Sequence, residues 1–107
     1  MLKVVLLLAR RADVSRGAFE RHLRETHAPL VARLPGLRRL VINYVHPDPA
    51  GPAPTVDAIA EDWFDDLPAM QAALGSPEGQ AVNADAANFL DLAATRFLVV
   101  HEEEVTL

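Results

Sequence analysis

The chain has 107 residues, half of them hydrophobic, which is enough for a single domain with its own core over residues 1–107. It contains no cysteine, so disulfides, thiolate zinc sites and cysteine nucleophiles are excluded. The net charge is −5, no apolar run approaches the roughly 20 residues that cross a bilayer, and neither a signal-peptide pattern nor an aromatic platform accompanies the arginines. We therefore expect a cytoplasmic protein that binds neither membranes nor nucleic acid.

The first third of the chain predicts a strand and a helix. Residues 2–9 are almost uninterruptedly apolar, the pattern of a central strand covered on both faces. Ser15 is a suitable N-cap for a helix over residues 15–33, in which apolar residues recur at helical spacing. Pro29 is expected to kink or end this helix, and Pro35 with Gly36 prevents any continuation.

The middle of the chain predicts two further strands. Residues 37–45 and 56–64 are rich in β-branched and aromatic residues. Between them, residues 46–55 contain four prolines and a glycine, which is typical of an exposed connection.

Two helices and a strand are predicted to follow. Asp65 and Asp66 before Pro68 open a short helix that Gly75 ends, and Ser76 before Pro77 starts a third helix through about residue 92. Residues 95–104 form the last strand. Glu102, Glu103 and Glu104 are a solvated tail or a strand edge.

This order, β-α-β-β-α(α)-β, is the ferredoxin-like arrangement of the α+β class, a four-stranded antiparallel sheet with helices on one face. The other face would be bare. Because the first and last strands are densely apolar, we expect that face to meet a second copy, which gives a homodimer through the sheet faces. Residues 1–46 carry nine basic and three acidic side chains, whereas residues 47–107 carry one basic and twelve acidic side chains. Because the two halves attract each other, we expect them to interleave in space or to pair between subunits.

His27 and Asp85 are polar residues at positions where a helical wheel expects apolar ones. His27 lies beside the stripe that contains Leu23, and Asp85 lies near the middle of the face that should pack on the sheet. A buried carboxylate needs a donor, and both helices cover the same sheet face, so we predict an Asp85–His27 pair. The alternatives are that His27 caps carbonyls or packs in the core and that Asp85 binds backbone amides.

The substrate-binding residues expected around this pair are a mixture of polar and apolar side chains. Asn43 and Tyr44 could complete a polar patch, Leu23 and Phe89 lie on the apolar helix faces, and Trp63 belongs to the core or forms a pocket wall. His22 lies about 140° from His27 on an α-helix, so the two should not share one ion, and we expect no metal site.

Several motifs occur in a matching order along almost the whole chain: residues 22–30 (HLRETHAPL), 34–39 (LPGLRR), 59–64 (IAEDWF), 76–78 (SPE), then Ala84, Asp85 and Phe89. With these motifs the chain resembles the EthD-like proteins of the dimeric α+β barrel superfamily. The resemblance implies a two-sheet dimeric barrel with a pocket between helices and sheet in each subunit. It also implies that His27 and Asp85 are pocket residues.

Relatives in this superfamily include proteins of ether degradation and cofactor-free monooxygenases, cyclases, dehydratases and lactone isomerases, so the resemblance does not fix the reaction. Our first hypothesis is a cofactor-independent enzyme on a small hydrophobic, aromatic or polyketide-like compound. In it His27 moves a proton and Asp85 orients His27, with no haem or other cofactor. The alternatives are a non-catalytic binding or accessory protein for a hydrophobic ligand, and a purely structural dimer with a filled core.

Overall fold

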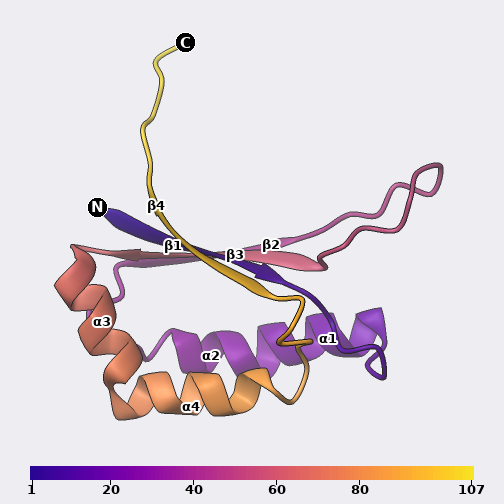
Figure 1. Ribbon diagram of the computed structural model, residues 1–107, viewed down its shortest axis with the longest axis horizontal. Coiled ribbons are helices and arrows are strands. Elements are labelled where there is room, and N and C mark those ends of the chain that lie inside the picture. The colour runs from indigo at the N-terminus through magenta and orange to yellow at the C-terminus, as the bar shows by residue number, and fades with distance from the viewer.

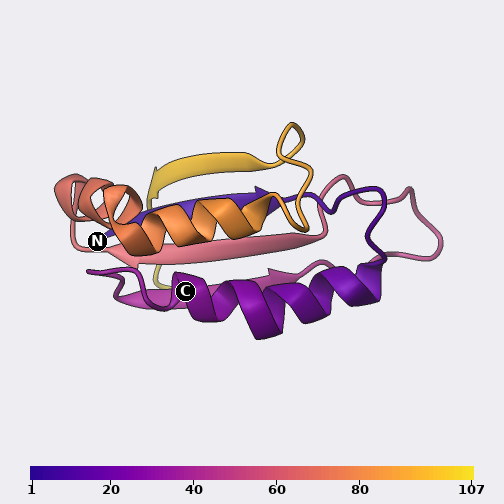
Figure 2. The same ribbon diagram turned by 90° about the horizontal axis from the view of Figure 1, so that it is seen from below.

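The computed structural model describes residues 1–107 and shows one layer of helices on one face of a sheet (Figure 1, Figure 2). The strands form one antiparallel sheet in the order β2-β3-β1-β4, which confirms the predicted ferredoxin-like fold. None of the helices is long and apolar enough to span a bilayer. The elements are β1 (Leu2–Leu8), α1 (Arg16–His22), a π-helical turn (Leu23–His27), α2 (Ala28–Val31), β2 (Arg39–Tyr44), β3 (Ala58–Phe64), α3 (Leu67–Gly75), α4 (Pro77–Ala86) and β4 (Arg96–His101).

Strand β1 is central, as its apolar run predicts, and pairs with β3 on one side and β4 on the other. Its side chains alternate between the two faces of the sheet. Val4 and Leu8 point toward the helices and are buried, whereas Lys3, Val5 and Leu7 are only half-buried. We call the uncovered side the open face; cross-strand pairing adds to it Arg39, Val41, Asn43, Ile59, Glu61, Trp63, Arg96, Leu98 and Val100.

The first helix contains a π-helical turn that the sequence did not predict. It begins at the predicted cap, where Ser15 Oγ accepts the amide of Ala18 at 3.1 Å. Over Leu23–His27 the backbone widens, so that the amide of Ala28 bonds to the carbonyl of Leu23, five residues earlier. Pro29 follows directly. It lacks an amide hydrogen and would crowd an α-helical turn, and the wider turn before it lets the helix continue to Val31.

Helices α3 and α4 begin where the sequence predicts them, with Asp66 and Ser76 as N-caps. The prediction that the third helix reaches residue 92 is wrong, because α4 ends at Ala86. A tight turn follows, in which the amide of Asn88 bonds to the carbonyl of Asp85. This turn brings Phe89 into the core, where it is 1% exposed.

The apolar core consists of two clusters that lie side by side between the sheet and the helices. One contains Leu8, Phe19, Leu23, Ala58, Ala60, Phe89 and Leu90. The other contains Val4, Val31, Leu34, Phe64, Met70 and Ala73. Residues of both clusters border the cavity described below, so the cavity lies where they meet.

Candidate functional site

Asp85, in the last turn of α4, is the centre of a buried polar cluster. Its side chain is 9% exposed. Its Oδ2 lies 2.8 Å from Nδ1 of His27 and 2.9 Å from Nε2 of His22, and its Oδ1 lies 3.1 Å from Nδ2 of Asn88. The predicted contact between His27 and Asp85 is therefore present, and Asp85 binds side chains rather than backbone amides.

The π-helical turn brings His22 into this cluster, which corrects the sequence interpretation. On an α-helix, two residues five apart diverge by about 140°. In a π-helical turn the hydrogen bonds join residues five apart, so His22 and His27 lie on the same side of the helix. Both imidazoles thereby reach the same carboxylate. The sequence signal was Pro29, which disfavours a regular α-helical turn just before it.

The hydrogen bonds fix the ionisation of Asp85 and the tautomer of His27. Burial raises the pKa of Asp85, but the hydrogen bonds from Asn88, His27 and His22 outweigh it and hold this pKa below its usual value. An ionised carboxylate only accepts, so Nδ1 of His27 carries a proton and donates. Burial lowers the pKa of His27, although Asp85 opposes that shift. A neutral His27 with a free lone pair on Nε2 follows.

Phe89 supports both imidazole rings from within the core. Its ring centroid lies 4.6 Å from that of His22 and 4.8 Å from that of His27, and Phe19 packs behind it at 5.5 Å. These contacts restrict the two rings to the orientation in which they meet Asp85. Phe89 was predicted to contact substrate; the structure places it beneath the histidines and outside the lining of the cavity.

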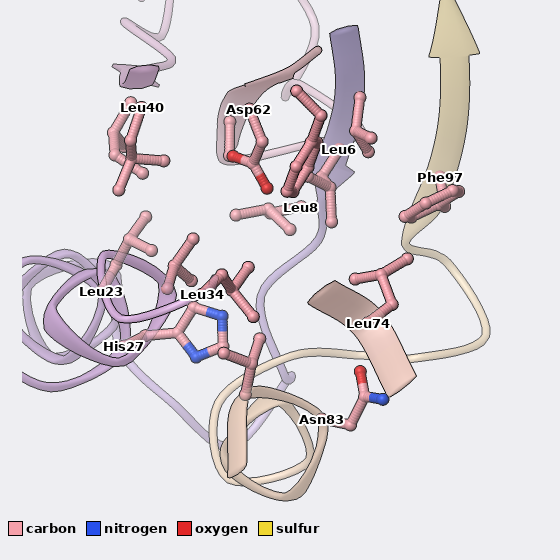
Figure 3. Close-up of a pocket in the computed structure, with 16 residues that line it drawn as sticks. Leu6, Leu8, Leu23, His27, Leu34, Leu40, Asp62, Leu74, Asn83 and Phe97 are labelled. Carbon is pink, nitrogen blue, oxygen red and sulfur yellow. The ribbon is translucent and has the colours of Figure 1, made fainter. Parts of the chain in front are cut away.

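A cavity of about 90 Å³ lies between the helices and the sheet, next to His27 (Figure 3). It exceeds the roughly 10–15 Å³ that one water molecule needs. Thirteen of its sixteen lining residues are hydrophobic, and the polar ones are His27, Asp62 and Asn83. The others are Val4, Leu6, Leu8, Leu23, Val31, Leu34, Leu40, Ile42, Ala60, Phe64, Leu74, Val82 and Phe97, so the predicted pocket residue Leu23 is among them.

Asp62 of β3 is a second buried carboxyl group, which the sequence interpretation missed. It is 7% exposed, and its Oδ1 has no hydrogen-bond partner. Burial alone raises the pKa of Asp62 to about 6. A signal was present in the sequence: Asp62 is in phase with Ala58, Ala60 and Phe64, the residues of β3 that face the helices.

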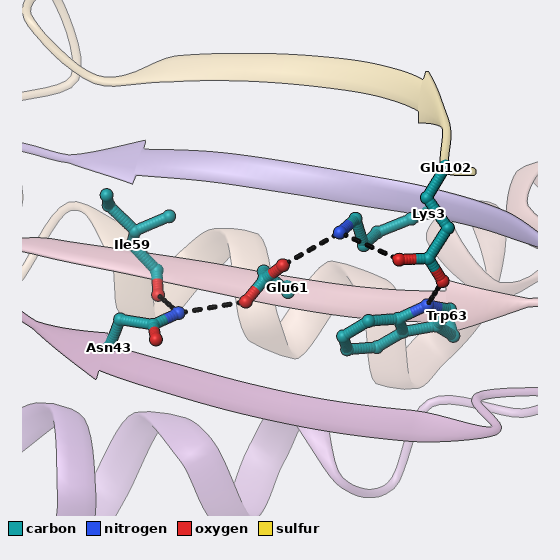
Figure 4. Close-up of polar contacts among 6 residues, drawn as sticks. All are labelled: Lys3, Asn43, Ile59, Glu61, Trp63 and Glu102. Atoms are coloured by element: carbon teal, nitrogen blue, oxygen red, sulfur yellow. Dashed lines mark hydrogen bonds and ion pairs between the residues drawn. The ribbon is translucent and has the colours of Figure 1, made fainter. Parts of the chain in front are cut away.

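Two predicted pocket residues, Asn43 and Trp63, lie on the open face, away from the cavity (Figure 4). Asn43 Nδ2 donates to Glu61 at 2.9 Å, and Trp63 Nε1 donates to Glu102 at 2.6 Å. Strand pleating explains the correction, because neighbouring residues along a strand point to opposite faces. Glu102 also binds Lys3 at 3.2 Å and is therefore tied to the sheet, while Glu103 and Glu104 are exposed.

Tyr44, the remaining predicted substrate contact, lies on the helix-covered face but outside the cavity. It packs against the core cluster that contains Phe19, and the guanidinium of Arg24 lies 4.8 Å from its ring. The polar patch expected from Asn43 and Tyr44 next to His27 is therefore not formed. No group of three or more His, Cys, Asp or Glu side chains is arranged so that it could hold a metal ion.

Comparisons with known proteins agree on a family. The EthD domain model matches residues 11–93. An uncharacterized 11.0 kDa protein from the thcB-thcC intergenic region of Rhodococcus erythropolis is 32% identical over 105 residues, which are 98% of each chain. A crystal structure of an EthD family protein from Bacillus halodurans superposes with a TM-score of 0.82 at 29% identity, covering 96% of this chain and 99% of that one.

More distant structures share the fold. A dimeric protein of unknown function with a ferredoxin-like fold from Bacteroides fragilis has a TM-score of 0.70 at 16% identity, over 94% of this chain and 95% of its own. SnoaB, a cofactor-independent oxygenase from Streptomyces nogalater, has a TM-score of 0.69 at 15% identity, over 97% of this chain and 94% of its own. The family model and the Rhodococcus relative cover most of the sequence, and the chain belongs to the EthD domain family.

Proposed function

We propose that this protein is a cofactor-independent enzyme that moves a proton on a small hydrophobic compound, with His27 as the base and Asp85 as the residue that orients it. One observation carries the proposal: His27 is held by Asp85 through Nδ1 and also borders an apolar cavity. A general base needs a free lone pair close to its substrate and a fixed orientation. His27 meets both requirements: the hydrogen bond from Nδ1 to Asp85 fixes the ring, and Nε2 keeps its lone pair.

The same arrangement favours proton removal from a carbon atom next to a carbonyl group. His27 accepts the proton at Nε2, and the adjacent Asp85 carboxylate stabilises the positive charge that forms on the imidazole. The apolar lining lowers the local polarity next to His27, which strengthens this interaction. Proton transfer of this kind begins isomerisations, dehydrations, cyclisations and oxygenations of aromatic or polyketide-like compounds. The structural neighbour SnoaB is described as a cofactor-independent oxygenase, which supports this range.

A homodimer through the open face is part of this proposal. The open face carries the apolar side chains of Val5, Leu7, Val41, Ile59 and Leu98, and no helix covers it (Figure 1). Leu98 is 48% exposed. A second copy would remove these side chains from water. The neighbour from Bacteroides fragilis is described as dimeric and supports the same expectation.

A second candidate is a non-catalytic binding or accessory protein for a hydrophobic ligand. The lining of the cavity favours it, because thirteen of sixteen residues there are hydrophobic and would hold an apolar molecule whether or not chemistry follows. In that case His27 and Asp85 only add polarity to the wall. The two candidates differ in whether a bound compound is changed.

Hydrogen–deuterium exchange distinguishes them. Small cyclic ketones are incubated with the protein in D₂O, and loss of the protons next to the carbonyl is followed by ¹H NMR. We expect exchange above background. His27→Ala should reduce it by about 100-fold or more, the usual contribution of a general base. Asp85→Asn should reduce it less, because the base remains but loses its orienting partner.

The matched control is His46→Ala, since His46 is an exposed histidine in the connection between β2 and β3. It should exchange ketone protons at the wild-type rate. Equal exchange by the wild type and His27→Ala would contradict the proposed function. Ketone binding without exchange by the wild type would contradict it as well and would favour the binding protein.

A further inference from the structure

Asp62 has an environment that is unusual for a carboxyl group. It lies on β3 in the middle of the sheet, where its cross-strand neighbours are Val4 and Leu40. Ala60 and Phe64 flank it along the strand on the same face. All four neighbours are apolar.

Nothing within the protein compensates for the burial of this group. Asp62 is 7% exposed, and its Oδ1 is fully enclosed without a partner. Buried polar atoms are nearly always hydrogen-bonded, so an orphaned one needs an explanation. Asp62 also lines the cavity, so a ligand that binds there can give its carboxyl group the partner that the protein does not supply.

The cavity has a titratable group on each of its two layers. Figure 3 shows the carboxyl group of Asp62 pointing from the sheet into the space that His27 borders from the helical layer. The third polar residue, Asn83 of α4, carries no charge, and every other lining residue is hydrophobic. A ligand in this cavity would therefore meet two proton-exchanging groups, one from each layer.

We propose that Asp62, in its uncharged form, is the hydrogen-bond donor of the cavity, and that it binds the carbonyl oxygen of a small neutral ketone or enone. This inference rests on the proposed function, for which it names the substrate class. The base and the donor lie on opposite layers, so a carbonyl oxygen at Asp62 leaves the adjacent carbon for His27.

The proton balance of such a step is closed. His27 removes the proton from the carbon next to the carbonyl, the electron pair of that bond forms a carbon–carbon double bond, and the carbonyl electron pair moves onto oxygen. The oxygen takes the proton of Asp62, which gives the enol. When the enol collapses, Asp62 recovers its proton, and His27 returns the other proton to the same carbon or to a conjugated one. The net result is exchange or isomerisation, with no oxidant or reductant.

The chemistry of the lining favours a neutral carbonyl over a charged ligand. An anion would meet Asp62 without a basic residue in the lining to balance it. A cation would require Asp62 to be ionised, whereas burial raises the pKa of Asp62 to about 6, so the uncharged acid predominates below that pH. His27 is the one other titratable group that lines the cavity, and burial lowers its pKa, so it adds no positive charge at neutral pH.

A pair of shape-matched probes tests this inference without requiring turnover. Cyclopentanone has the carbonyl oxygen, and methylenecyclopentane has a CH₂ group in its place. Their affinities are measured by NMR titration at about pH 5 and about pH 7.5, on either side of the pKa of Asp62. The wild type should prefer the ketone by about threefold to tenfold at the lower pH, the usual value of one hydrogen bond, and lose this preference at the higher pH.

Two substitutions separate the donor from the charge. Asp62→Asn keeps a donor that does not titrate, so the preference for the ketone should persist at both pH values. Asp62→Leu has no donor and should show no preference at either. Asp65→Asn, an exposed carboxyl group just after the same strand, is the control and should behave like the wild type.

Three results would overturn the inference: a ketone preference in Asp62→Leu, a wild-type preference that does not change with pH, or preferential binding of cyclopentylamine at the higher pH that Asp62→Asn abolishes. The last result would make Asp62 a cation site. These probes measure binding and not proton exchange. If the ketone preference behaves as expected but no proton exchange occurs, the proposed function is contradicted and the donor role of Asp62 is not.

Discussion

Oδ2 of Asp85 lies 2.8 Å from Nδ1 of His27 and 2.9 Å from Nε2 of His22, so one carboxylate oxygen joins two imidazoles. The two rings differ in exposure, because the side chain of His22 is 27% exposed and that of His27 is 9% exposed. Asp85 thus connects a histidine near solvent with one at the wall of the cavity.

Replacing Asp85 by Asn should lower the pKa of His27 further. Burial already lowers this pKa, and the hydrogen bond and charge of Asp85 oppose the shift, so the amide would remove the main opposing influence. The pKa is measured by NMR titration of the imidazole protons. Asp65→Asn should leave it unchanged. A pKa of His27 that rises in Asp85→Asn would show that the carboxylate does not stabilise the charged imidazole.

Replacing Asp62 by Asn should stabilise the protein more at neutral pH than in acid. The pKa of Asp62 is about 6 in the folded protein against 3.8 as reference, so its contribution to stability is fully present below about pH 4 and is lost as the pH rises through 6. The change in the free energy of unfolding that Asp62 causes over this pH range is about 3 kcal/mol. Urea denaturation of both proteins from about pH 4 to pH 7.5 measures it.

The exposed Asp65 provides a control of opposite sign for that experiment. The hydrogen bond from Arg38 lowers the pKa of Asp65, so its contribution is present above the reference pKa and is lost in acid. Asp65→Asn should therefore destabilise the protein slightly at neutral pH. A constant difference between the wild type and Asp62→Asn at every pH would contradict the raised pKa of Asp62.

Leu98→Asp should weaken the proposed homodimer, whereas Val99→Asp should not. The two residues are neighbours on β4 with similar exposure, 48% and 44%, and they point to opposite faces of the sheet. A charge buried against a second copy at Leu98 should raise the dissociation constant by about 10-fold or more. Sedimentation equilibrium over a concentration series measures it. Equal effects of both substitutions would argue against dimerisation through the open face.

Gly79→Ala should destabilise the protein by about 1–3 kcal/mol. A Cβ atom at Gly79 would collide with the backbone carbonyl oxygens of Ala73 and Leu74, because α4 starts directly against the end of α3. Gly75→Ala is the matched control. No atom lies within 4 Å of a Cβ built there, so its stability should be unchanged or slightly higher. Thermal unfolding followed by circular dichroism compares the two variants.

Local signals were sufficient to predict the fold. The apolar run of β1 predicted a central strand, and the caps Ser15, Asp66 and Ser76 marked the helix starts that the structure has. These signals involve neighbouring residues and elementary backbone chemistry. The end of α4 was missed by several residues, because no glycine or proline marks the turn after Ala86.

The site could be predicted only in part, since it depends on geometry that a regular periodicity does not contain. Asp85 was found because it interrupts an apolar helix face. His22 was excluded because an ideal α-helix was assumed where the backbone forms a π-helical turn. Asn43 and Trp63 were expected at the pocket, and Asp62 was overlooked, because the pleat of the strands was not applied to these residues.

The π-helical turn at Leu23–His27 behaves as one extra residue inserted in an otherwise α-helical segment. A chain with one residue fewer between the two histidines would place them four apart, where a regular α-helix already aligns side chains. The same pair around one carboxylate can thus be encoded by two different spacings. In an alignment of this chain with a shorter-spaced homologue, a single-residue gap belongs within residues 23–26, and omitting it would mismatch one of the two histidines.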